Sequence, residues 1–296
     1  MKDVLFEKDL SRRDIISSVG FGGFAKRDGF FSELRIKNDD CSLPSPEGSI
    51  KFIAFDVFGT LVDWRGTMIR EFAVLFEEKE ITNVSCEEFI GLWVNAYSEN
   101  MTKISEGTRP FATVDELNKI ALNKTLEHYQ ILNKFTEPER EQMWMVWHRL
   151  EPWPDVPSGI NKLKERFSIG VLSNGNIRLL EDLSKNAGFE WDIILSGELV
   201  QCYKPNPLVY QSAAKVLKLK ASEILLVASH KYDLEAARQC GFKTAYIFRP
   251  LEFGTVKEEQ IPGDDGFDFV TEGMDDLAKQ VTVTAPKPEV RMCSLY

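Results

Sequence analysis

Polar residues that could carry out displacement chemistry follow four apolar runs, each typical of a buried strand. The first run, in FIAFDVFGTLVDW, ends at the carboxylate of Asp56. In an open α/β sheet, ligands bind beyond the carboxyl ends of the strands, so residues at these ends share one crevice. We therefore expect one site to contain Asp56 with Thr60, Ser173 with Asn174, Lys204, and Ser229 with Asp233.

The types of these residues suit an aspartate that acts as a nucleophile. Such a carboxylate must stay ionised when partly buried, and the ammonium group of Lys204 near Asp56 would lower the pKa of Asp56. Ser173 can donate a hydrogen bond to the same carboxylate. Asn174 can stabilise a leaving anion or a substrate carboxylate, and Asp233 can orient or deprotonate water. Each residue alone is typical of a cap or a turn, but the ordered set favours a catalytic site.

The elements that would position these residues belong to a parallel sheet. From Ile50 onward, short apolar runs alternate with amphipathic helical stretches, which predicts an α/β fold with a doubly wound parallel sheet. The expected strands are IKFIAFDV, SIGVLSN, DIILSG, EILLVAS and TAYIFR. The expected helices are IRLLEDLSKNAG, NPLVYQSAAKVLKL and DLEAARQCG, the last with Asp233 as its N-cap.

The segment between the first two strands is about ninety residues long, too long for a single crossover, and its apolar residues recur at helical spacing. We therefore predict an inserted helical cap. Its tryptophans, Trp93, Trp144 and Trp147, favour core packing over a cofactor pocket. The expected division is an N-terminal extension (1–49), a core (50–64 and 151–280), a cap (65–150) and a C-terminal tail (281–296).

The composition favours a small-molecule partner. The net charge of -10 and the pI near 5.0 argue against a nucleic-acid surface, which needs clustered lysine and arginine. No run has the roughly 18 apolar residues of a membrane span, so we expect no membrane partner. The five cysteines are scattered, which favours free thiols in a reducing compartment. The sequence leaves open whether the protein is a homodimer.

The N-terminal segment leaves the predicted location with an alternative. Ser11, Arg12 and Arg13 resemble a twin-arginine export signal, but the apolar stretch behind them is short and stops at Lys26 and Arg27. A loosely ordered extension of a cytoplasmic protein is therefore the favoured interpretation, and export is the alternative.

The motifs FDVFGTLVDW, LSNGN, YKPNPLVY and VASHKYDLEAARQCGFKTAYIFRP, in this order, resemble those of the haloacid dehalogenase superfamily. The resemblance covers roughly residues 50–280 and is greatest to the type II 2-haloacid dehalogenase branch. It implies a Rossmann-like core, a helical cap and Asp56 as the nucleophile. It also implies that Lys204 and Ser173 position Asp56, that Asn174 binds halide or substrate, and that Asp233 supports a water molecule.

Phe58 indicates that the leaving group does not need a proton. Phosphatases of this superfamily have a second aspartate two positions after the first, which protonates a departing alkoxide, whereas this chain has Phe58 there. A halide leaves without a proton, and an aromatic ring excludes water from an apolar carbon–halogen bond. The resemblance thus implies hydrolysis of a 2-haloalkanoate to a 2-hydroxy acid through an ester on Asp56. Such a reaction needs no metal or other cofactor, because no phosphoryl charge is neutralised.

Two positions depart from the type II pattern. Those enzymes have an arginine directly after a cap tryptophan, where it holds halide and carboxylate, but here Val94 follows Trp93. Arg65 and Arg109 are candidates for the missing charge. The second departure is His230, where related dehalogenases can have asparagine; it could orient water or substrate, or satisfy backbone groups. The predicted substrate-binding residues are therefore Arg65, Arg109 and His230, together with Phe58, Thr60, Asn174 and Ser229.

Two other functions remain open from the sequence. One is a magnesium-dependent phosphatase with Asp56, the carbonyl of Phe58 and Asp233 as metal ligands, which the phenylalanine disfavours. The other is an inactive relative that serves as a binding module, which Val94 suggests and the intact polar set disfavours. The physiological substrate and the role of residues 1–49 do not follow from the sequence.

Overall fold

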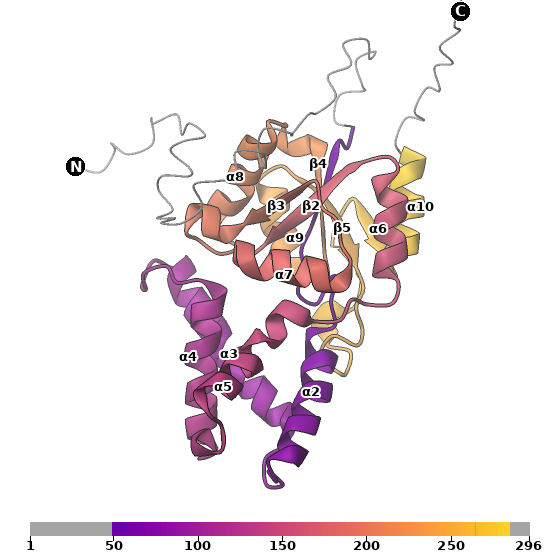
Figure 1. Ribbon diagram of the computed structural model, residues 1–296. Helices are drawn as coiled ribbons and strands as arrows, with labels where there is room; N and C mark the ends of the chain where they lie inside the picture. Colours follow the sequence, from indigo (N-terminus) through magenta and orange to yellow (C-terminus); the bar gives the residue numbers. More distant parts are fainter. Residues whose placement is uncertain (1–48, 264, 285–296) are drawn as a thin grey trace, which may run out of the picture. The chain divides into compact units, whose positions relative to one another are not determined.

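The computed structural model describes residues 49–263 and 265–284, which contain one parallel sheet surrounded by helices (Figure 1). The strand order is β3-β2-β1-β4-β5-β6, and every neighbouring pair is parallel. The α/β doubly wound fold predicted from the sequence is confirmed. The strands are β1 (Phe52–Phe55), β2 (Ser168–Ser173), β3 (Ile193–Ser196), β4 (Ile224–Ala228), β5 (Lys243–Ile247) and β6 (Phe269–Thr271).

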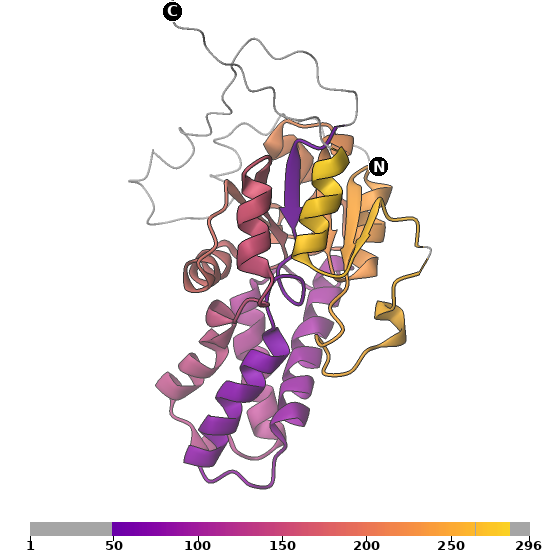
Figure 2. The same ribbon diagram turned by 90° about the vertical axis from the view of Figure 1, so that its right-hand side faces the viewer.

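Helices cover both faces of the sheet because side chains alternate along each strand. In β1, Ile53 and Phe55 join the apolar cluster that includes α6 (Val156–Lys164), α7 (Ile177–Ala187) and α10 (Met274–Thr284). Phe52 and Ala54 join the cluster that includes α8 (Pro207–Leu217) and α9 (Lys231–Gln239). Figure 2 shows α6 and α10 side by side on the first face.

The segment between β1 and β2 is helical, as predicted, and lies beyond the carboxyl end of β1 (Figure 1). We call α2 to η2 the inserted helices. Two of them begin with capping boxes, formed by Thr113 with Glu116 and by Thr136 with Glu139. They comprise α2 (Trp64–Glu78), α3 (Cys86–Ser105), α4 (Val114–His128), α5 (Glu137–Trp144) and the 3₁₀ segments η1 (Leu132–Lys134) and η2 (Met145–Arg149). The remaining 3₁₀ segments are η3 (Gly197–Val200), η4 (Ala221–Glu223) and η5 (Glu258–Gln260).

The tryptophans of the inserted helices are packing residues, in agreement with the sequence prediction. Trp93, Trp144 and Trp147 are buried, and the ring centroids of Trp93 and Trp147 lie 6.2 Å apart. Trp93 also donates its indole N–H to the backbone oxygen of Asn118 on α4. The aromatic rings therefore hold α3, α4 and η2 together.

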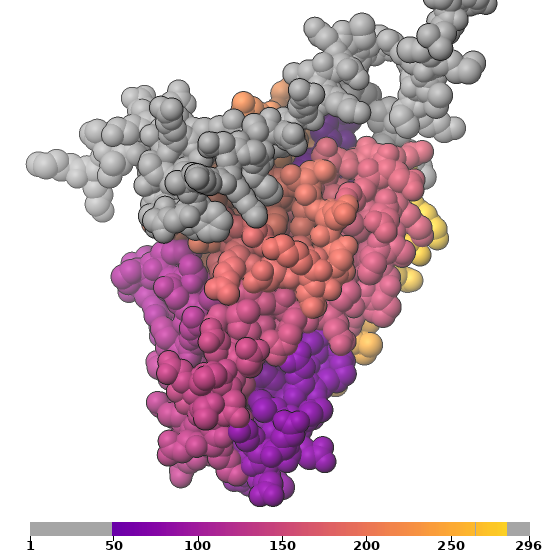
Figure 3. Space-filling model, in the orientation of Figure 1, coloured from indigo at the N-terminus to yellow at the C-terminus, as the bar shows by residue number. Residues whose placement is uncertain are grey.

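Polar contacts join the inserted helices to the sheet layer. His148 on η2 lies 3.0 Å from Asp115 on α4 and 3.0 Å from Asp182 on α7. The side-chain amide of Asn176, next to α7, donates to Asp115 over 3.0 Å. In the space-filling view, the surface of the inserted helices continues into that of α7 on this face (Figure 3).

Three details differ from the sequence predictions. β6 has only three residues and was not predicted, because so short a strand has little periodicity. α9 begins at Lys231 with His230 as its N-cap, so Asp233 lies in the first turn instead of at the cap. α10 extends to Thr284, past the core boundary expected at residue 280.

No helix in the described part of the chain is long and apolar enough to cross a membrane. The twin-arginine-like residues lie outside the described residues.

Candidate active site

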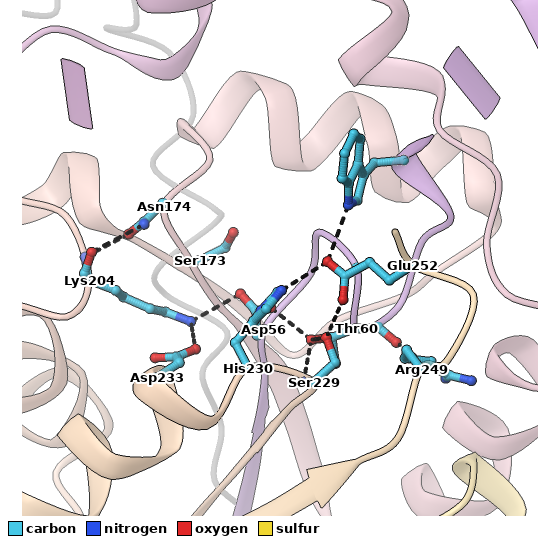
Figure 4. A network of polar contacts seen from close by, with 12 residues as sticks. Asp56, Thr60, Ser173, Asn174, Lys204, Ser229, His230, Asp233, Arg249 and Glu252 are labelled. Atoms are coloured by element: carbon cyan, nitrogen blue, oxygen red, sulfur yellow. Dashed lines mark hydrogen bonds and ion pairs between the residues drawn. The ribbon is translucent and has the colours of Figure 1, made fainter. Parts of the chain in front are cut away.

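Asp56 lies directly after β1, at the carboxyl end of a central strand (Figure 4). Its backbone N–H donates to the oxygen of Val227, which continues the pairing of β1 with β4. Asp56 is buried, with 8% of its surface exposed. Its Oδ1 accepts a hydrogen bond from Lys204 over 3.2 Å, and its Oδ2 accepts one from Thr60 over 2.7 Å. Both oxygens are therefore held in a fixed orientation.

Lys204 lies between two carboxylates. Its Nζ donates to Asp56 and, over 2.6 Å, to Asp233, whose other oxygen accepts a hydrogen bond from the hydroxyl of Tyr210 over 2.6 Å. Burial opposes ionisation of Asp56, but Lys204, His230 and Thr60 together outweigh it and hold the pKa of Asp56 well below its usual range. The two carboxylates in turn raise the pKa of Lys204, although burial acts in the opposite direction. Asp56 is therefore ionised and lies beside a protonated Lys204.

Asp233 differs from Asp56 although it shares the same lysine. Burial, together with the nearby charge of Asp56, raises the pKa of Asp233 despite the contact with Lys204. Both of its oxygens already have partners, and only 1% of its surface is exposed. Asp233 therefore acts in the structure as an anchor for Lys204.

A second set of contacts lies on the other side of Asp56. The Nδ1 atom of His230 lies 3.3 Å from Asp56 Oδ2, and its Nε2 lies 2.9 Å from Glu252 Oε1. Burial lowers the pKa of His230, but the carboxylates of Glu252 and Asp56 outweigh it and raise that pKa well above its usual value. The contacts with the two carboxylates therefore favour the protonated form of the imidazole ring.

Thr60 and Ser229 connect these contacts. The hydroxyl of Thr60 donates to Asp56 and accepts from the backbone N–H of Ser229 over 2.9 Å. The hydroxyl of Ser229 lies 3.1 Å from that of Thr60 and donates to Glu252 over 3.4 Å. Arg249, which is also buried, donates to the backbone oxygen of Thr60 over 3.0 Å and so fixes the loop after Asp56.

Ser173 and Asn174 lie at the end of β2, beside Lys204. The amide of Asn174 contacts the backbone of Lys204, because its Oδ1 accepts from the lysine N–H over 2.7 Å. Its Nδ2 lies 3.5 Å from the lysine carbonyl oxygen. The hydroxyl of Ser173 accepts the N–H of Gly175, and within the described residues the expected hydrogen bond from Ser173 to Asp56 does not form.

Phe58 is half-buried in the loop after Asp56 and forms part of an aromatic wall. Its ring packs edge-on against Trp147, with ring centroids 5.5 Å apart, and Trp147 also contacts Tyr97. Gly59 has φ +79°, and a Cβ there would lie 2.0 Å from Glu252 Oε1. The loop thus requires glycine at position 59, because a larger residue would collide with Glu252.

Each of the two candidate arginines contacts a residue of α3. Arg65 lies 3.8 Å from Glu87, and Arg109 donates to Asn100. Val94 is half-buried and packs against the main apolar cluster. The structure places neither arginine in contact with Asp56, so a role for them in substrate binding stays a prediction.

Magnesium does not fit the set of oxygen ligands that the phosphatase alternative requires. That set consists of Asp56, the carbonyl of Phe58 and Asp233. The ammonium group of Lys204 lies between the two carboxylates, and Tyr210 occupies the second oxygen of Asp233. Among residues 49–263 and 265–284, no group of three or more His, Cys, Asp or Glu could hold a metal ion.

The sequence analysis missed Tyr210, Glu252 and Arg249. Tyr210 belongs to the quoted motif YKPNPLVY, six positions after Lys204. Its place in the same motif as Lys204 was the signal that could have identified it. Arg249 follows β5 in IFRP, at the end of a strand that the sequence did predict. Glu252 lies in a loop without regular periodicity, and only the folded chain brings it to His230.

Comparison with known proteins shows which family the chain belongs to. An (S)-2-haloacid dehalogenase of Pseudomonas sp. (strain YL) is 30% identical over 223 residues, which are 71% of this chain and 86% of that protein. The crystal structure of an L-2-haloacid dehalogenase is 36% identical, with a TM-score of 0.75, and the match covers 79% of this chain and 100% of that one. A defluorinating L-2-haloacid dehalogenase is 34% identical, with a TM-score of 0.76 and coverages of 82% and 100%. A model of the haloacid dehalogenase-like hydrolases matches residues 50–241. The chain belongs to the haloacid dehalogenase-like hydrolase family.

Proposed function

We propose that this protein is an L-2-haloacid dehalogenase that works through an ester on Asp56. An oxygen of Asp56 attacks C2 of a 2-haloalkanoate, a carbon–oxygen bond forms, and the halide leaves with the electrons of the carbon–halogen bond. Attack from the side opposite the halide inverts C2. Water then cleaves the ester at the carboxyl carbon of Asp56 and releases a 2-hydroxy acid. The substrate is thus a small molecule, and the named relatives support this choice.

The observation that carries the proposal is the buried ion pair between Asp56 and Lys204, which keeps a nucleophilic carboxylate charged away from water. A nucleophile that is ionised and poorly hydrated is more reactive than one in bulk water. Lys204 and Thr60 hold one oxygen each, and Asn174 holds the backbone of Lys204. These contacts orient the carboxylate before the substrate arrives, which lowers the entropic barrier to attack.

Phe58 determines what kind of group can leave. Its ring has no proton to donate, and it packs against Trp147 beside the nucleophile. An alkoxide requires a proton when it departs, whereas a halide is the anion of a strong acid and does not. The aromatic wall therefore favours a carbon–halogen bond over a phosphate ester. No step of the proposed reaction uses a metal ion, because no phosphoryl charge develops.

We further infer that the inserted helices serve as a cap over this site, with residues 65–150 as the cap and residues 50–64 and 151–280 as the core. Trp64 and Phe72 of α2 are buried in the same apolar cluster as Phe55 and Val57, which flank Asp56. A cap that excludes water protects the ester from nonspecific reaction and strengthens the charge interactions below it. A homodimer and a cytoplasmic location stay predictions from the sequence.

The test is halide release from a panel of 2-haloacids, including both enantiomers of 2-chloropropionate, with and without EDTA. We expect release from the L-enantiomer that EDTA does not change, and a D-2-hydroxy acid as the product. Asp56→Asn should abolish release while the far-UV circular dichroism spectrum is unchanged. A single turnover in ¹⁸O-labelled water should place the label in Asp56 instead of in the product. Label found only in the 2-hydroxy acid would contradict the ester mechanism.

A further inference from the structure

We propose that His230 is the base that activates the hydrolytic water, and that Glu252 positions the imidazole ring for this step. The assignment rests on the proposed function and concerns its second half, cleavage of the ester on Asp56. His230 lies between the two carboxylates, with Nδ1 facing Asp56 and Nε2 facing Glu252 (Figure 4).

The position of His230 suits a base for this reaction. Its Nδ1 lies 3.3 Å from Asp56 Oδ2, so a water molecule that approaches the carboxyl carbon of Asp56 comes within hydrogen-bond reach of the ring. When the ring is neutral and Nε2–H donates to Glu252, the lone pair is on Nδ1 and faces the ester. The contact with Glu252 thus selects the tautomer that can accept a proton.

Asp233, which the sequence suggested for this role, is less suitable. Its oxygens are occupied by Lys204 and Tyr210, each over 2.6 Å, and Lys204 separates it from Asp56. A base needs a lone pair that is directed at the attacking water. Of the described titratable side chains that contact Asp56 directly, His230 can present such a lone pair, whereas Lys204 is protonated.

Glu252 is held in place by several contacts. Its Oε1 accepts the indole N–H of Trp64 over 3.2 Å, and its Oε2 accepts the hydroxyl of Ser229 over 3.4 Å. The carboxylate lies against the backbone of Gly59, where a Cβ would collide with it. Glu252 itself is 2% exposed. A buried carboxylate fixed in this way orients the imidazole ring and stabilises its charged form.

The charge of Asp56 couples the two halves of the reaction. In the resting enzyme two carboxylates face the ring, and the pKa of His230 is raised. Ester formation makes Asp56 neutral, so the pKa of His230 falls and the ring releases its proton to solvent. Water then attacks the carboxyl carbon of Asp56 and gives one proton to Nδ1. The bond between the carboxyl carbon of Asp56 and the alkoxide oxygen then breaks, the second water proton moves to the departing alkoxide, and both the Asp56 carboxylate and protonated His230 are restored.

Other charged and titratable groups near the ring keep their state through this cycle. Lys204 and Asp233 lie beyond Asp56, on the loop before α8 and on α9, and stay paired with each other. Tyr232 on α9 lies beside the ring, with centroids 5.5 Å apart, and Tyr246 lies on β5. Burial raises the pKa of both tyrosines, so they remain neutral at the pH of the reaction. Alkylation of Asp56 is therefore the charge change that the ring experiences.

The test uses the full chain and separates halide release from ester cleavage by rapid quenching. His230→Asn keeps a side-chain N–H near Asp56 but cannot accept a proton. We expect about one equivalent of halide per enzyme, followed by ester hydrolysis slower by roughly 10²- to 10⁴-fold, the usual contribution of a general base. Intact-protein mass spectrometry should show the ester on Asp56. The control His128→Asn, at an exposed position on α4, should turn over like the wild type.

Glu252→Gln tests the positioning role. The amide keeps the shape of the side chain but removes one charge from the ring, so the pKa of His230 falls. The acidic limb of the pH profile for ester cleavage should therefore move to lower pH, and the maximal rate should fall. The control Glu127→Gln, at an exposed position, should leave the profile unchanged.

The outcomes separate this inference from the proposed function. If the wild-type protein releases no halide from any 2-haloacid, the proposed function fails. If the wild type turns over and folded His230→Asn also turns over at the wild-type rate, the assignment of the base is wrong. Loss of halide release in folded His230→Asn, without ester, would likewise overturn it, because it would place His230 in the first step.

Discussion

The Nζ atom of Lys204 lies 3.2 Å from Asp56 Oδ1, and both side chains are buried at the carboxyl end of β1. Removing one member of a buried ion pair leaves an uncompensated charge, which typically costs about 3–5 kcal/mol. We expect Lys204→Met to lose stability on this scale and to raise the pKa of Asp56. Urea unfolding measures the first effect, and the pH dependence of the halide burst measures the second.

The matched control for this prediction is Lys162→Met. Lys162 pairs with Asp275 over 2.8 Å, but both side chains are more than half exposed, at 55% and 54%. Exposed pairs contribute about 0–1 kcal/mol, so this substitution should change the free energy of unfolding little. Equal losses in the two variants would contradict the role of burial in holding Asp56 charged.

Gly59→Ala should impair both activity and stability. Gly59 has φ +79°, and a Cβ there would displace the carboxylate of Glu252. The backbone strain alone costs about 1–2 kcal/mol. The control is Gly188→Ala at the C-terminal end of α7, where φ is +71° and no other atom lies within 4 Å of the added Cβ. We expect Gly59→Ala to lose more stability than Gly188→Ala in thermal unfolding, because it also displaces buried Glu252, and to have the lower kcat.

The stability of the protein should fall on the alkaline side because of His230. Its pKa is raised in the folded state, so protonation of His230 favours folding fully below the unfolded value near 6.5 and ceases to do so as pH rises through the folded value. The melting temperature of the wild type should therefore decrease above neutral pH by more than that of His230→Asn. Parallel curves for the two proteins between pH 6 and 9 would be inconsistent with a raised pKa.

Val94→Arg tests whether position 94 can hold substrate. A guanidinium group there could donate charge-assisted hydrogen bonds to a halide or carboxylate, each of which contributes about 1.5–3 kcal/mol. We expect the KM for a 2-haloacid to fall by about tenfold while kcat changes less. Val94→Met adds length without charge and is the control. An unchanged KM in both variants would mean that the site already has the charge it needs.

The sequence predicted Asp56, Lys204 and Asp233 as one cluster because each follows an apolar run and parallel strands bring their ends together. It did not predict that Asp233 faces Lys204, because that depends on α9 beginning three residues earlier than its capping signal suggested. Glu252 left no local signal, because its partner His230 is 22 positions away and a loop brings the two together. Loop positions of this kind depend on tertiary packing, which local periodicity does not encode.

The covered position of Asp56 has a kinetic consequence. Only 8% of its surface is exposed, and His148 joins the inserted helices to α7 through Asp115 and Asp182. Under the proposed function, we expect a 2-haloacid to reach the carboxylate when these layers separate, and the 2-hydroxy acid to leave the same way. Each catalytic cycle would then break and re-form the contacts that His148 makes between α4, η2 and α7. The frequency of that motion sets an upper limit on turnover, however fast the bonds at Asp56 are made and broken.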